Sequence, residues 1–446
     1  MTLDHAGTGR GSHQSSETIV LSDGSKDAHR PRVVAAGARS VAGWSWGPLY
    51  GGPGDVQVSV KSGPGSAWGQ PVTLSSAEYA IGPELAVAGD GTIAATWTQT
   101  GQVFVSILTP GSDVWTNPVQ LSDADPIAGG AEQPRIAGGP DGTVTVAWSQ
   151  WAVVERHPEK KTITRERGVF LSSFDPLIGE WPPPVVIAGA HEVAEVACRP
   201  DGLVAVAWVG DGSVLVSTRA SLASPWEGPE SISAPDTRLF SEVQIVATVA
   251  GDLFAIWTCL VGNVEGFSNR RDAVQVAELR SGSRRWSYPE TLYRLGDHGQ
   301  AMAPSLAVDG TGAMAAVWWM HGFPYPQSGP AVVVSQLPAG ASKWTAPGEL
   351  TRTAIRDPDP WVAGFPEGGF VASWGEFDGR DARAQYSIIA PQGGSWTSPR
   401  SLSAAGASGD SPRVGVSGSR SAELVWRRKR DDRWRIESCR LEIDIE

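Results

Sequence analysis

The chain has 446 residues, of which 41% are hydrophobic and 20 are tryptophan, so it can bury a large core and is not a disordered protein. Its 53 glycines and 33 prolines interrupt the sequence every few residues, which excludes long helices, and no apolar run is long enough to span a membrane. The formal net charge of −12 argues against a nucleic-acid-binding protein, because such proteins present a basic face to phosphate.

The N-terminus is polar, and we expect residues 1–16 to form a flexible tail before a single domain over residues 17–446. No apolar signal core is visible in it, so we expect a cytoplasmic protein, or a secreted one if the N-terminus has been trimmed. The apolar segment 17–22 is the first predicted strand. Cys198, Cys259 and Cys439 lie far apart without paired spacing, which favours reduced, buried thiols over disulfides or a zinc site.

From residue 40 onward, one phrase recurs eight times: a turn, a short apolar strand and a tryptophan. Its copies are spaced by about 55 residues, which is the sign of a repeat architecture. The copies end at Trp44, Trp97, Trp148, Trp208, Trp257, Trp318, Trp374 and Trp426.

Each copy is followed by a second apolar strand, and seven copies then show a Trp-x-x-Pro phrase that leads into a further strand. The second strands are predicted over residues 56–60, 103–107, 169–172, 214–217, 274–277, 332–335, 385–388 and 435–438. The Trp-x-x-Pro phrases begin at Trp68, Trp115, Trp181, Trp226, Trp286, Trp344 and Trp396. The eighth copy lacks this phrase, but segment 17–22 matches the strand that follows it elsewhere.

Each repeat therefore contains four short strands with period-two alternation, joined by tight glycine-containing turns. Eight such units predict an all-β protein, a single eight-bladed β-propeller of four-stranded antiparallel blades. The displaced strand predicts the closure of the ring, with the N-terminal strand pairing into the last blade. Two four-bladed rings would be the alternative, but the sequence shows no linker between them.

The phrases Trp-x-x-Pro-x-x-Leu-Ser and Asp-Gly-x-Val-x-Val-Ala-Trp resemble those of bacterial Trp-rich tandem-repeat propellers, which are often described as sialidase-like. The resemblance covers residues 17–446 and implies the fold, because that family is functionally mixed. The sialidase Asp-box, Ser-x-Asp-x-Gly-x-x-Trp, is absent, and no Arg triad with a Tyr–Glu pair is evident. The resemblance therefore gives no support for sialidase chemistry.

The loops on one face of the ring are expected to carry the function. With the strands of a blade named A to D from the axis outward, the connections B–C and D–A share the face on which strand A begins, here called the upper face. The B–C loops vary in length, with insertions at residues 151–167, 260–271 and 321–330, and irregular loops on a repetitive scaffold are a usual place for a binding site. Five histidines, His29, His157, His191, His298 and His321, are expected in these loops rather than in strands.

Blade six concentrates the groups most suited to proton transfer, and neighbouring loops add further charges and aromatic rings. The predicted catalytic groups are His298, His321, His191 and Glu192. The predicted substrate-binding side chains are Trp319, Tyr325, Phe323, Arg356, Glu376, Trp361, His157 and Trp46. No cofactor is required by the sequence; a divalent cation could bind at Asp123–Asp125 or Asp357–Asp359, although solvated turn residues are the simpler interpretation.

A second candidate is a ring of mostly polar residues near the start of strand A, one in each blade. Seven lie thirteen residues before the repeat Trp, and the first blade is one residue shorter. They are Arg32, Glu84, Arg135, Glu195, Gln244, Ser305, Trp361 and Arg413. Two interpretations remain open: salt bridges between neighbouring blades, or a polar rim that orients a ligand over the channel.

The loops differ from blade to blade, so eight equivalent lectin sites are not expected. The sequence favours one asymmetric site over the channel and an acid–base enzyme of lyase, hydrolase or cyclase type that acts on a sugar or another small molecule. The alternative is a non-catalytic ligand- or carbohydrate-binding propeller, or a protein-interaction scaffold. We expect a monomer with no nucleic-acid or membrane partner.

Overall fold

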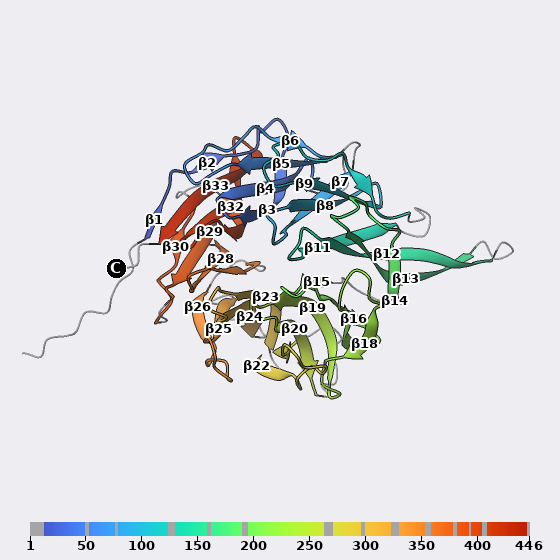
Figure 1. Ribbon diagram of the computed structural model, residues 1–446. Helices are drawn as coiled ribbons and strands as arrows, with labels where there is room; N and C mark the ends of the chain where they lie inside the picture. The colour runs from blue at the N-terminus through green and yellow to red at the C-terminus, as the bar shows by residue number, and fades with distance from the viewer. Residues whose placement is uncertain are drawn as a thin grey trace, which may run out of the picture.

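The computed structural model describes residues 13–49, 53–75, 79–123, 130–157, 162–189, 195–262, 271–295, 299–322, 330–352, 358–377, 381–391, 394–403 and 408–443. Within these ranges the chain forms strands and no helix, so none of it forms a helix that could cross a membrane. The strands build eight antiparallel sheets arranged as one eight-bladed β-propeller (Figure 1). The predicted fold is confirmed.

In blades one to seven the strands follow the order A to D along the chain, and blade eight takes its outer strands from the N-terminus. The A strands are β3 (Ala28–Ala36), β7 (Ala80–Val87), β11 (Ala131–Gly138), β15 (Glu195–Cys198), β19 (Thr237–Ala247), β23 (Gly299–Val308), β27 (Trp361–Gly364) and β31 (Gly409–Val416). The B strands are β4 (Arg39–Trp46), β8 (Ile93–Gln99), β12 (Val144–His157), β16 (Val204–Gly210), β20 (Leu253–Val261), β24 (Met314–Gly322), β28 (Phe370–Phe377) and β32 (Ser421–Arg430).

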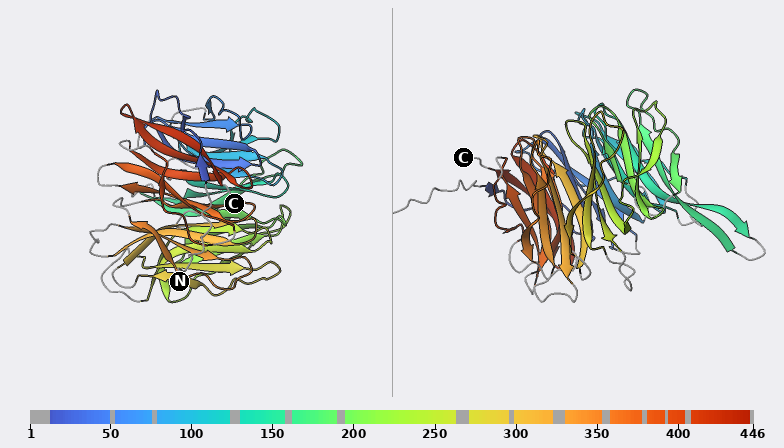
Figure 2. Two further views of the ribbon diagram at one scale, coloured as in Figure 1. Left: turned by 90° about the vertical axis from the view of Figure 1, so that its left-hand side faces the viewer. Right: turned by 90° about the horizontal axis from the view of Figure 1, so that it is seen from below.

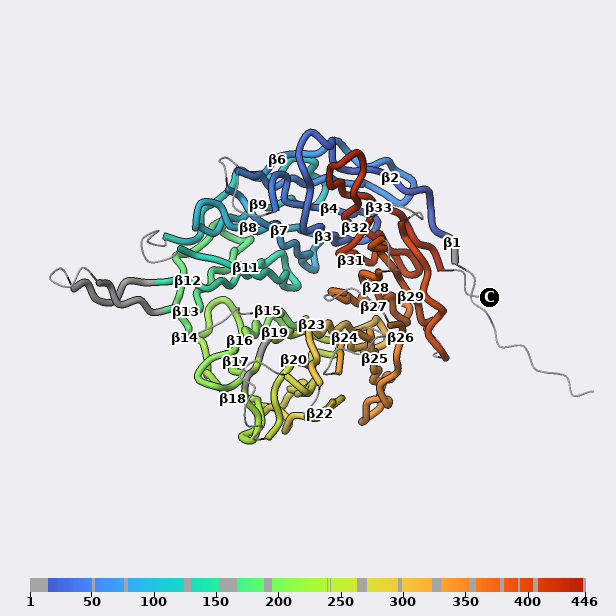
Figure 3. The backbone as a smooth tube through the Cα atoms, turned by 180° about the vertical axis from the view of Figure 1, so that it is seen from behind, coloured from blue at the N-terminus to red at the C-terminus, as the bar shows by residue number. Residues whose placement is uncertain are grey.

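The outer half of each blade follows the same plan. The C strands are β5 (Asp55–Lys61), β9 (Gln102–Leu108), β13 (Thr162–Phe174), β17 (Ser213–Arg219), β21 (Ala273–Leu279), β25 (Ala331–Leu337), β29 (Ala382–Ile389) and β33 (Arg433–Ile443). The D strands are β6 (Val72–Thr73), β10 (Val119–Gln120), β14 (Val185–Gly189), β18 (Glu227–Ser231), β22 (Glu290–Arg294), β26 (Gly348–Arg352) and β30 (Arg400–Ser401). The A strands contact one another around the axis of the ring (Figure 3). Residues of all eight A strands line the central channel.

The B strands are buried on both faces instead of alternating between core and solvent. In β8 and β16 all residues but one are buried. The reason is that each sheet is packed between two neighbouring sheets, so neither face of its middle strands reaches water. The period-two alternation expected from the sequence is therefore wrong for these strands.

The eight repeat tryptophans form the contacts between blades. Each is fully buried and packs against the preceding blade: Trp148 lies against Val103 and Val105 of β9, for example. The last contact of the ring follows the same rule, because Trp44 packs against Val425 and Ile436 of blade eight. A large aromatic side chain at the same point of every blade thus provides a uniform spacer around the ring.

The N-terminus closes the ring, as the displaced strand predicts. The strands β1 (His13–Ser15) and β2 (Ile19–Val20) both pair with β33, the outermost strand of the C-terminal part of blade eight. Leu21 is buried beside them and donates its backbone N–H to the carbonyl of Ile436 at 2.8 Å. The segment 1–16, expected to be a flexible tail, thus contains the strand β1.

Three places expected to be in loops are in strands. The blade-three insertion at residues 151–167 continues β12 and β13 as a β-hairpin, with Trp151 opposite Arg167, and this hairpin projects from the side of the ring (Figures 1 and 2). His29, His157 and His321 belong to β3, β12 and β24, so the expectation that these histidines lie in loops is wrong. Neighbouring strands of these blades stay paired beyond the buried core, so the three histidines lie in strands.

We predict that replacing Trp148 or Trp208 by alanine destabilises the protein by roughly 3–5 kcal/mol, because each leaves a cavity between two blades. Both side chains are fully buried. Guanidinium chloride titrations of each variant would measure the loss. A change in the free energy of unfolding of less than about 1 kcal/mol would contradict the packing described above.

A second prediction concerns closure. Deletion of residues 1–22 removes β1, β2 and Leu21 and leaves the edge of β33 unpaired, so we expect a lower melting temperature and a tendency to aggregate. Deletion of residues 1–12 keeps both strands and serves as the control. Equal melting temperatures for the two truncations would rule out a stabilising role for this strand pairing.

Candidate functional site

A repeated kink in strand A places the ring of mostly polar residues at the channel. Two residues before each ring position, the backbone adopts a positive φ in the seven blades whose residue there is described. These residues are Arg30, Gly82, Gln133, Glu242, Ala303, Asp359 and Ser411. In six of these blades the A–B pairing shifts register at this point, for example between His29 and Arg32, which identifies a β-bulge. A bulge redirects the side chains that follow it.

The residue between the kink and the ring position is proline in six of the eight repeats. They are Pro31, Pro83, Pro134, Pro304, Pro360 and Pro412. Proline lacks a backbone N–H and is tolerated in a strand mainly at bulges and edges, which is where these residues lie. The proline is therefore a signal for the kink and, in blade seven, for Asp359, which also lines the channel. Glu242 lines it as well, but Val243 stands at the proline position of that blade, so this signal misses it.

Ion pairs link ring residues of neighbouring blades. Arg32 holds Glu84 through two hydrogen bonds, Nε to Oε2 at 2.7 Å and Nη2 to Oε1 at 2.8 Å. Arg135 Nε donates to Glu195 Oε1 at 2.5 Å, and its Nη1 lies 3.9 Å from Glu84. These contacts confirm that the ring forms salt bridges between blades, and they leave about a quarter of each side chain exposed.

The exposed parts of the ring line a cleft of about 530 Å³ in the channel. Its wall includes the charged residues of blades one to four, Gln244 and Glu242 of blade five, and a third ion pair, Arg413 Nη2 to Asp359 Oδ2 at 2.6 Å. Trp361 lies in the same wall, with the Arg413 guanidinium 5.1 Å from the centre of its ring. The cleft thus combines carboxyl groups, an amide and an aromatic face.

The two glutamates of the ring ionise differently. Burial raises the pKa of Glu84, but Arg32 and Arg135 lower it by more, so its pKa lies below the ordinary value. For Glu195, burial is the larger effect and outweighs the attraction of Arg135, so its pKa lies above the ordinary value. A pair of carboxyl groups with pKa values displaced in opposite directions is a common arrangement in acid–base active sites.

Among the substrate-binding residues expected from sequence, Trp361 lies in the wall of this cleft. Trp46 is half-buried elsewhere, under the Lys26 ammonium at 4.1 Å, and lines a smaller hollow. Glu376 is half-buried in β28, with Thr351 Oγ1 at 3.5 Å. His157 ends β12 in the projecting hairpin, away from the ring.

The described site candidates of blade six, Trp319 and His321, are not part of the cleft wall. Trp319 and His321 are each only 3% exposed, and their rings stack on each other at 5.5 Å. His321 Nδ1 lies 3.2 Å from the Gly322 carbonyl oxygen. The other candidates, His191, Glu192, His298, Phe323, Tyr325 and Arg356, lie outside the described residues, and their roles stay predictions.

Metal binding and thiol chemistry receive no support from the described part of the chain. Its histidines, cysteines and carboxylates form no group of three that could hold a metal ion. Asp125 and Asp357, half of each cation site considered above, lie outside that part. The three cysteines are unpaired, and burial raises the pKa of each thiol to about 12, so they stay protonated at neutral pH.

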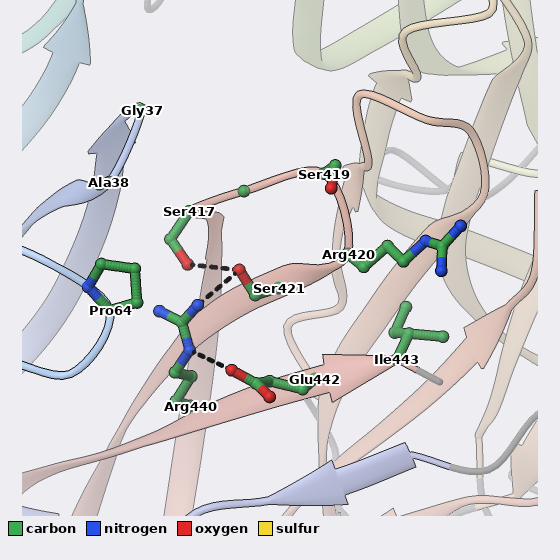
Figure 4. Close-up of a pocket in the computed structure, with 11 residues that line it drawn as sticks. Gly37, Ala38, Pro64, Ser417, Ser419, Arg420, Ser421, Arg440, Glu442 and Ile443 are labelled. Carbon is green, nitrogen blue, oxygen red and sulfur yellow. Dashed lines mark hydrogen bonds and ion pairs between the residues drawn. The ribbon is translucent and has the colours of Figure 1, made fainter. Parts of the chain in front are cut away.

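A second hollow of about 600 Å³ lies where blades eight and one meet, at their A–B turns (Figure 4). Arg440 crosses it and donates to Glu442 at 2.9 Å, Ser421 at 2.8 Å and Glu423 at 3.3 Å. Its guanidinium is thus used within blade eight, where it shares the buried Glu423 with Lys61 of blade one. This hollow is a feature of ring closure, and the channel cleft is the better candidate site.

No protein-family profile and no curated protein sequence matches the chain. Among solved structures, an ulvan lyase of polysaccharide lyase family PL25 bound to -[GlcA(1-4)Rha3S]- is similar, with 10% identity, coverage of 94% of this chain and 95% of that one, and a TM-score of 0.53. The polysaccharide lyase Uly1 is similar over 94% and 90%, with 9% identity and a TM-score of 0.51. A protein of unknown function from Dyadobacter fermentans covers 97% and 99%, with 12% identity and a TM-score of 0.47. At these identities the likeness to the two lyases establishes the fold alone.

His29 stands apart from the cleft, at the junction of blades eight and one. It is 3% exposed, and its Nδ1 accepts a hydrogen bond from Arg427 Nη1 at 3.0 Å. Arg427 in turn holds Asp410 through two hydrogen bonds of 2.7 and 2.6 Å. Burial and the nearby Arg427 charge lower the pKa of His29 to about 4, so the imidazole is neutral at physiological pH.

This lowered pKa predicts a loss of stability in acid. Below pH 6.5 the unfolded chain protonates His29, while the folded protein does so only near pH 4. The free energy of unfolding should therefore fall by about 3 kcal/mol from this group as the pH drops through that window. Urea titrations of wild type and His29→Gln between pH 8 and 4.5 test this, because the amide oxygen can accept from Arg427 but does not titrate. Parallel pH dependences would contradict it; the difference at pH 8 measures the packing cost alone.

Proposed function

We propose that the protein is an enzyme that performs acid–base chemistry on a carbohydrate in the channel cleft. The observation that carries the proposal is the pair Glu84 and Glu195, which flank Arg135 on the ring and have pKa values displaced in opposite directions. Carboxyl groups separated in this way can act as an acid and as an ionised partner in one reaction. The cleft that holds them is large enough for a sugar ligand.

Glu195 is the acid in this proposal. Its raised pKa increases the fraction of the carboxyl group that is protonated at a given pH, and the protonated form can give its proton to the oxygen that leaves when a glycosidic bond breaks. Glu84 stays ionised between Arg32 and Arg135, and both its oxygens are held by Arg32. A carboxylate fixed in this way stabilises positive charge on the sugar through its field and is not positioned as a nucleophile.

The remaining groups of the cleft would bind and orient the sugar. Trp361 offers an aromatic face to the C–H face of a sugar ring. Gln244 uses its amide oxygen to accept from the Leu306 backbone N–H at 2.6 Å, which leaves its NH₂ group to donate to a hydroxyl. The ulvan lyase with the same fold binds a polysaccharide fragment, which supports a carbohydrate as the ligand class here.

The second candidate is a non-catalytic carbohydrate-binding propeller. The two hydrogen bonds between Arg32 and Glu84 favour this candidate, because an ion pair of this kind can hold two blades together without any catalytic role. The two functions share the same cleft and the same ligand class. They differ in what Glu195 does, and one substitution separates them.

We predict that Glu195→Gln lowers kcat on a cleaved glycan by about 100-fold or more while the dissociation constant changes little, because the amide keeps the shape but carries no transferable proton. In the wild type, turnover should fall as the pH rises through the raised pKa of Glu195. Release of reducing ends from a panel of polysaccharides gives kcat, and calorimetric titration gives binding.

The matched control is Glu367→Gln, which neutralises an exposed carboxylate paired with Arg420 at 2.8 Å, outside the cleft wall. Equal turnover in Glu195→Gln and wild type would remove Glu195 from the reaction. Glycan binding by the wild type without turnover of any polysaccharide would identify the binding propeller instead.

A further inference from the structure

The arginines of the cleft are engaged by the protein itself. Arg32, Arg135 and Arg413 each donate Nη1 to the carbonyl oxygen of the proline that precedes them, at 3.1, 3.2 and 2.9 Å. Each also donates another nitrogen to a carboxylate: Arg32 to Glu84, Arg135 to Glu195, and Arg413 to Asp359. The shared geometry follows from the shared Pro-Arg pair at the bulge, which folds each guanidinium back onto its own strand.

The charges of the cleft wall do not favour an anion. Its described residues carry three guanidinium groups and four carboxyl groups, the fourth being Glu242, which accepts the Ala303 backbone N–H at 2.6 Å. The protein as a whole has a net charge of −12, so its field repels polyanions from every direction except where positive groups dominate locally. An anionic ligand that used Arg32 or Arg413 would have to displace a carboxylate already bound at 2.6–2.8 Å.

The side chains of the cleft that have unused hydrogen-bonding atoms are suited to bind hydroxyl groups. Glu195 uses Oε1 and Asp359 uses Oδ2 for their arginines, and the second oxygen of each accepts no hydrogen bond from the described residues. In the cleft that Trp361 also lines, the free Asp359 oxygen accepts, the Gln244 NH₂ group donates, and the free Glu195 oxygen carries the proton of the proposed acid. Sugar hydroxyls donate to carboxylates and accept from amides, and they need no charged partner.

We infer that the ligand of the channel cleft is an uncharged sugar chain and not a uronate-bearing or sulfated one. This inference rests on the proposed function and narrows it. It also separates this chain from the ulvan lyase of the same fold, whose bound fragment contains glucuronate and a sulfated rhamnose.

The inference also decides the reaction type. Elimination from a sugar removes a C–H proton that an adjacent carboxylate group acidifies, and an uncharged sugar has no such group. The glycosidic bond is therefore cleaved by hydrolysis or transfer. Glu195 donates its proton to the leaving oxygen as the bond from that oxygen to the anomeric carbon breaks, a water molecule or sugar hydroxyl adds to that carbon, and Glu195 takes up the proton that the incoming group loses.

The first experiment is a binding panel at 20 and 150 mM salt. Uncharged xylan, galactomannan, mixed-linkage β-glucan and α-glucan are compared with polygalacturonate, ulvan and dextran sulfate, and with chitosan oligosaccharides as cations. We expect an uncharged chain to bind at least tenfold more tightly than the polyanions, with little dependence on salt. Tighter binding of a polyanion or of chitosan would overturn the inference while leaving a carbohydrate function intact.

The second experiment releases a guanidinium. Asp359→Asn removes the charge paired with Arg413 and should raise affinity for polygalacturonate at least fivefold at 20 mM salt, with the gain lost at 150 mM salt. Glu367→Gln changes the net charge of the protein by the same amount away from the cleft and should produce no such gain. Equal gains in affinity for the two variants would show that Asp359 does not prevent anions from binding to Arg413. That result would overturn the inference.

The two levels of the proposal fail differently. If no glycan of any charge binds or is cleaved, and Glu195→Gln behaves as wild type, the carbohydrate function itself is wrong and the inference falls with it. If a polyanion is cleaved with a new unsaturated product that absorbs near 235 nm, the function stands and the uncharged substrate is wrong.

Discussion

The propeller depends on packing every sheet between two others. A four-stranded sheet of this size has two apolar faces, and neither can stay in water, so each blade must find a neighbour on both sides. The repeat tryptophan meets this constraint in the same way eight times, with each indole against the preceding blade. Because Trp44 packs on blade eight by the same rule, the chain ends have to meet, and the strand from the N-terminus completes the last blade.

This uniform scaffold leaves the inner ends of the A strands free to vary. The positive φ recurs in the seven blades where this residue is described, and the ring side chain lines the cleft in every blade except blade six, where Ser305 is buried. Non-glycine residues at positive φ cost of order 1 kcal/mol or more each, a cost that persists only where the surrounding pairing imposes it. The symmetry of the backbone is therefore independent of the asymmetry of the chemistry, which is how a repeat protein can hold a single site.

The charges at these positions serve structure and chemistry through the same contacts. Arg135 lies between Glu84 and Glu195, so the neighbour that stabilises one ion pair also lowers the pKa of a second carboxyl group. Glu84 has two arginines near it and Glu195 has one, and in a buried setting that difference is enough to displace their pKa values in opposite directions. The same arginines are occupied by carboxylates, and the residues described in the cleft wall carry no excess of positive charge.

The repeat pattern specifies the architecture, because a Trp-bearing strand repeated eight times and a displaced first strand have one closed arrangement that buries every blade. It also indicates which residue faces the channel in seven of the eight blades, since the spacing to the repeat Trp is nearly constant and a proline precedes that residue in six repeats. In blade six the indicated residue, Ser305, is buried instead. Only the tertiary structure decided which charges pair, because Arg413 meets Asp359 and Arg135 meets Glu195 across boundaries between blades, where sequence distance carries no information. It also decided that His321 is buried against Trp319, because the hairpin of blade six extends past its core and packs that imidazole where a sequence pattern predicts an open loop.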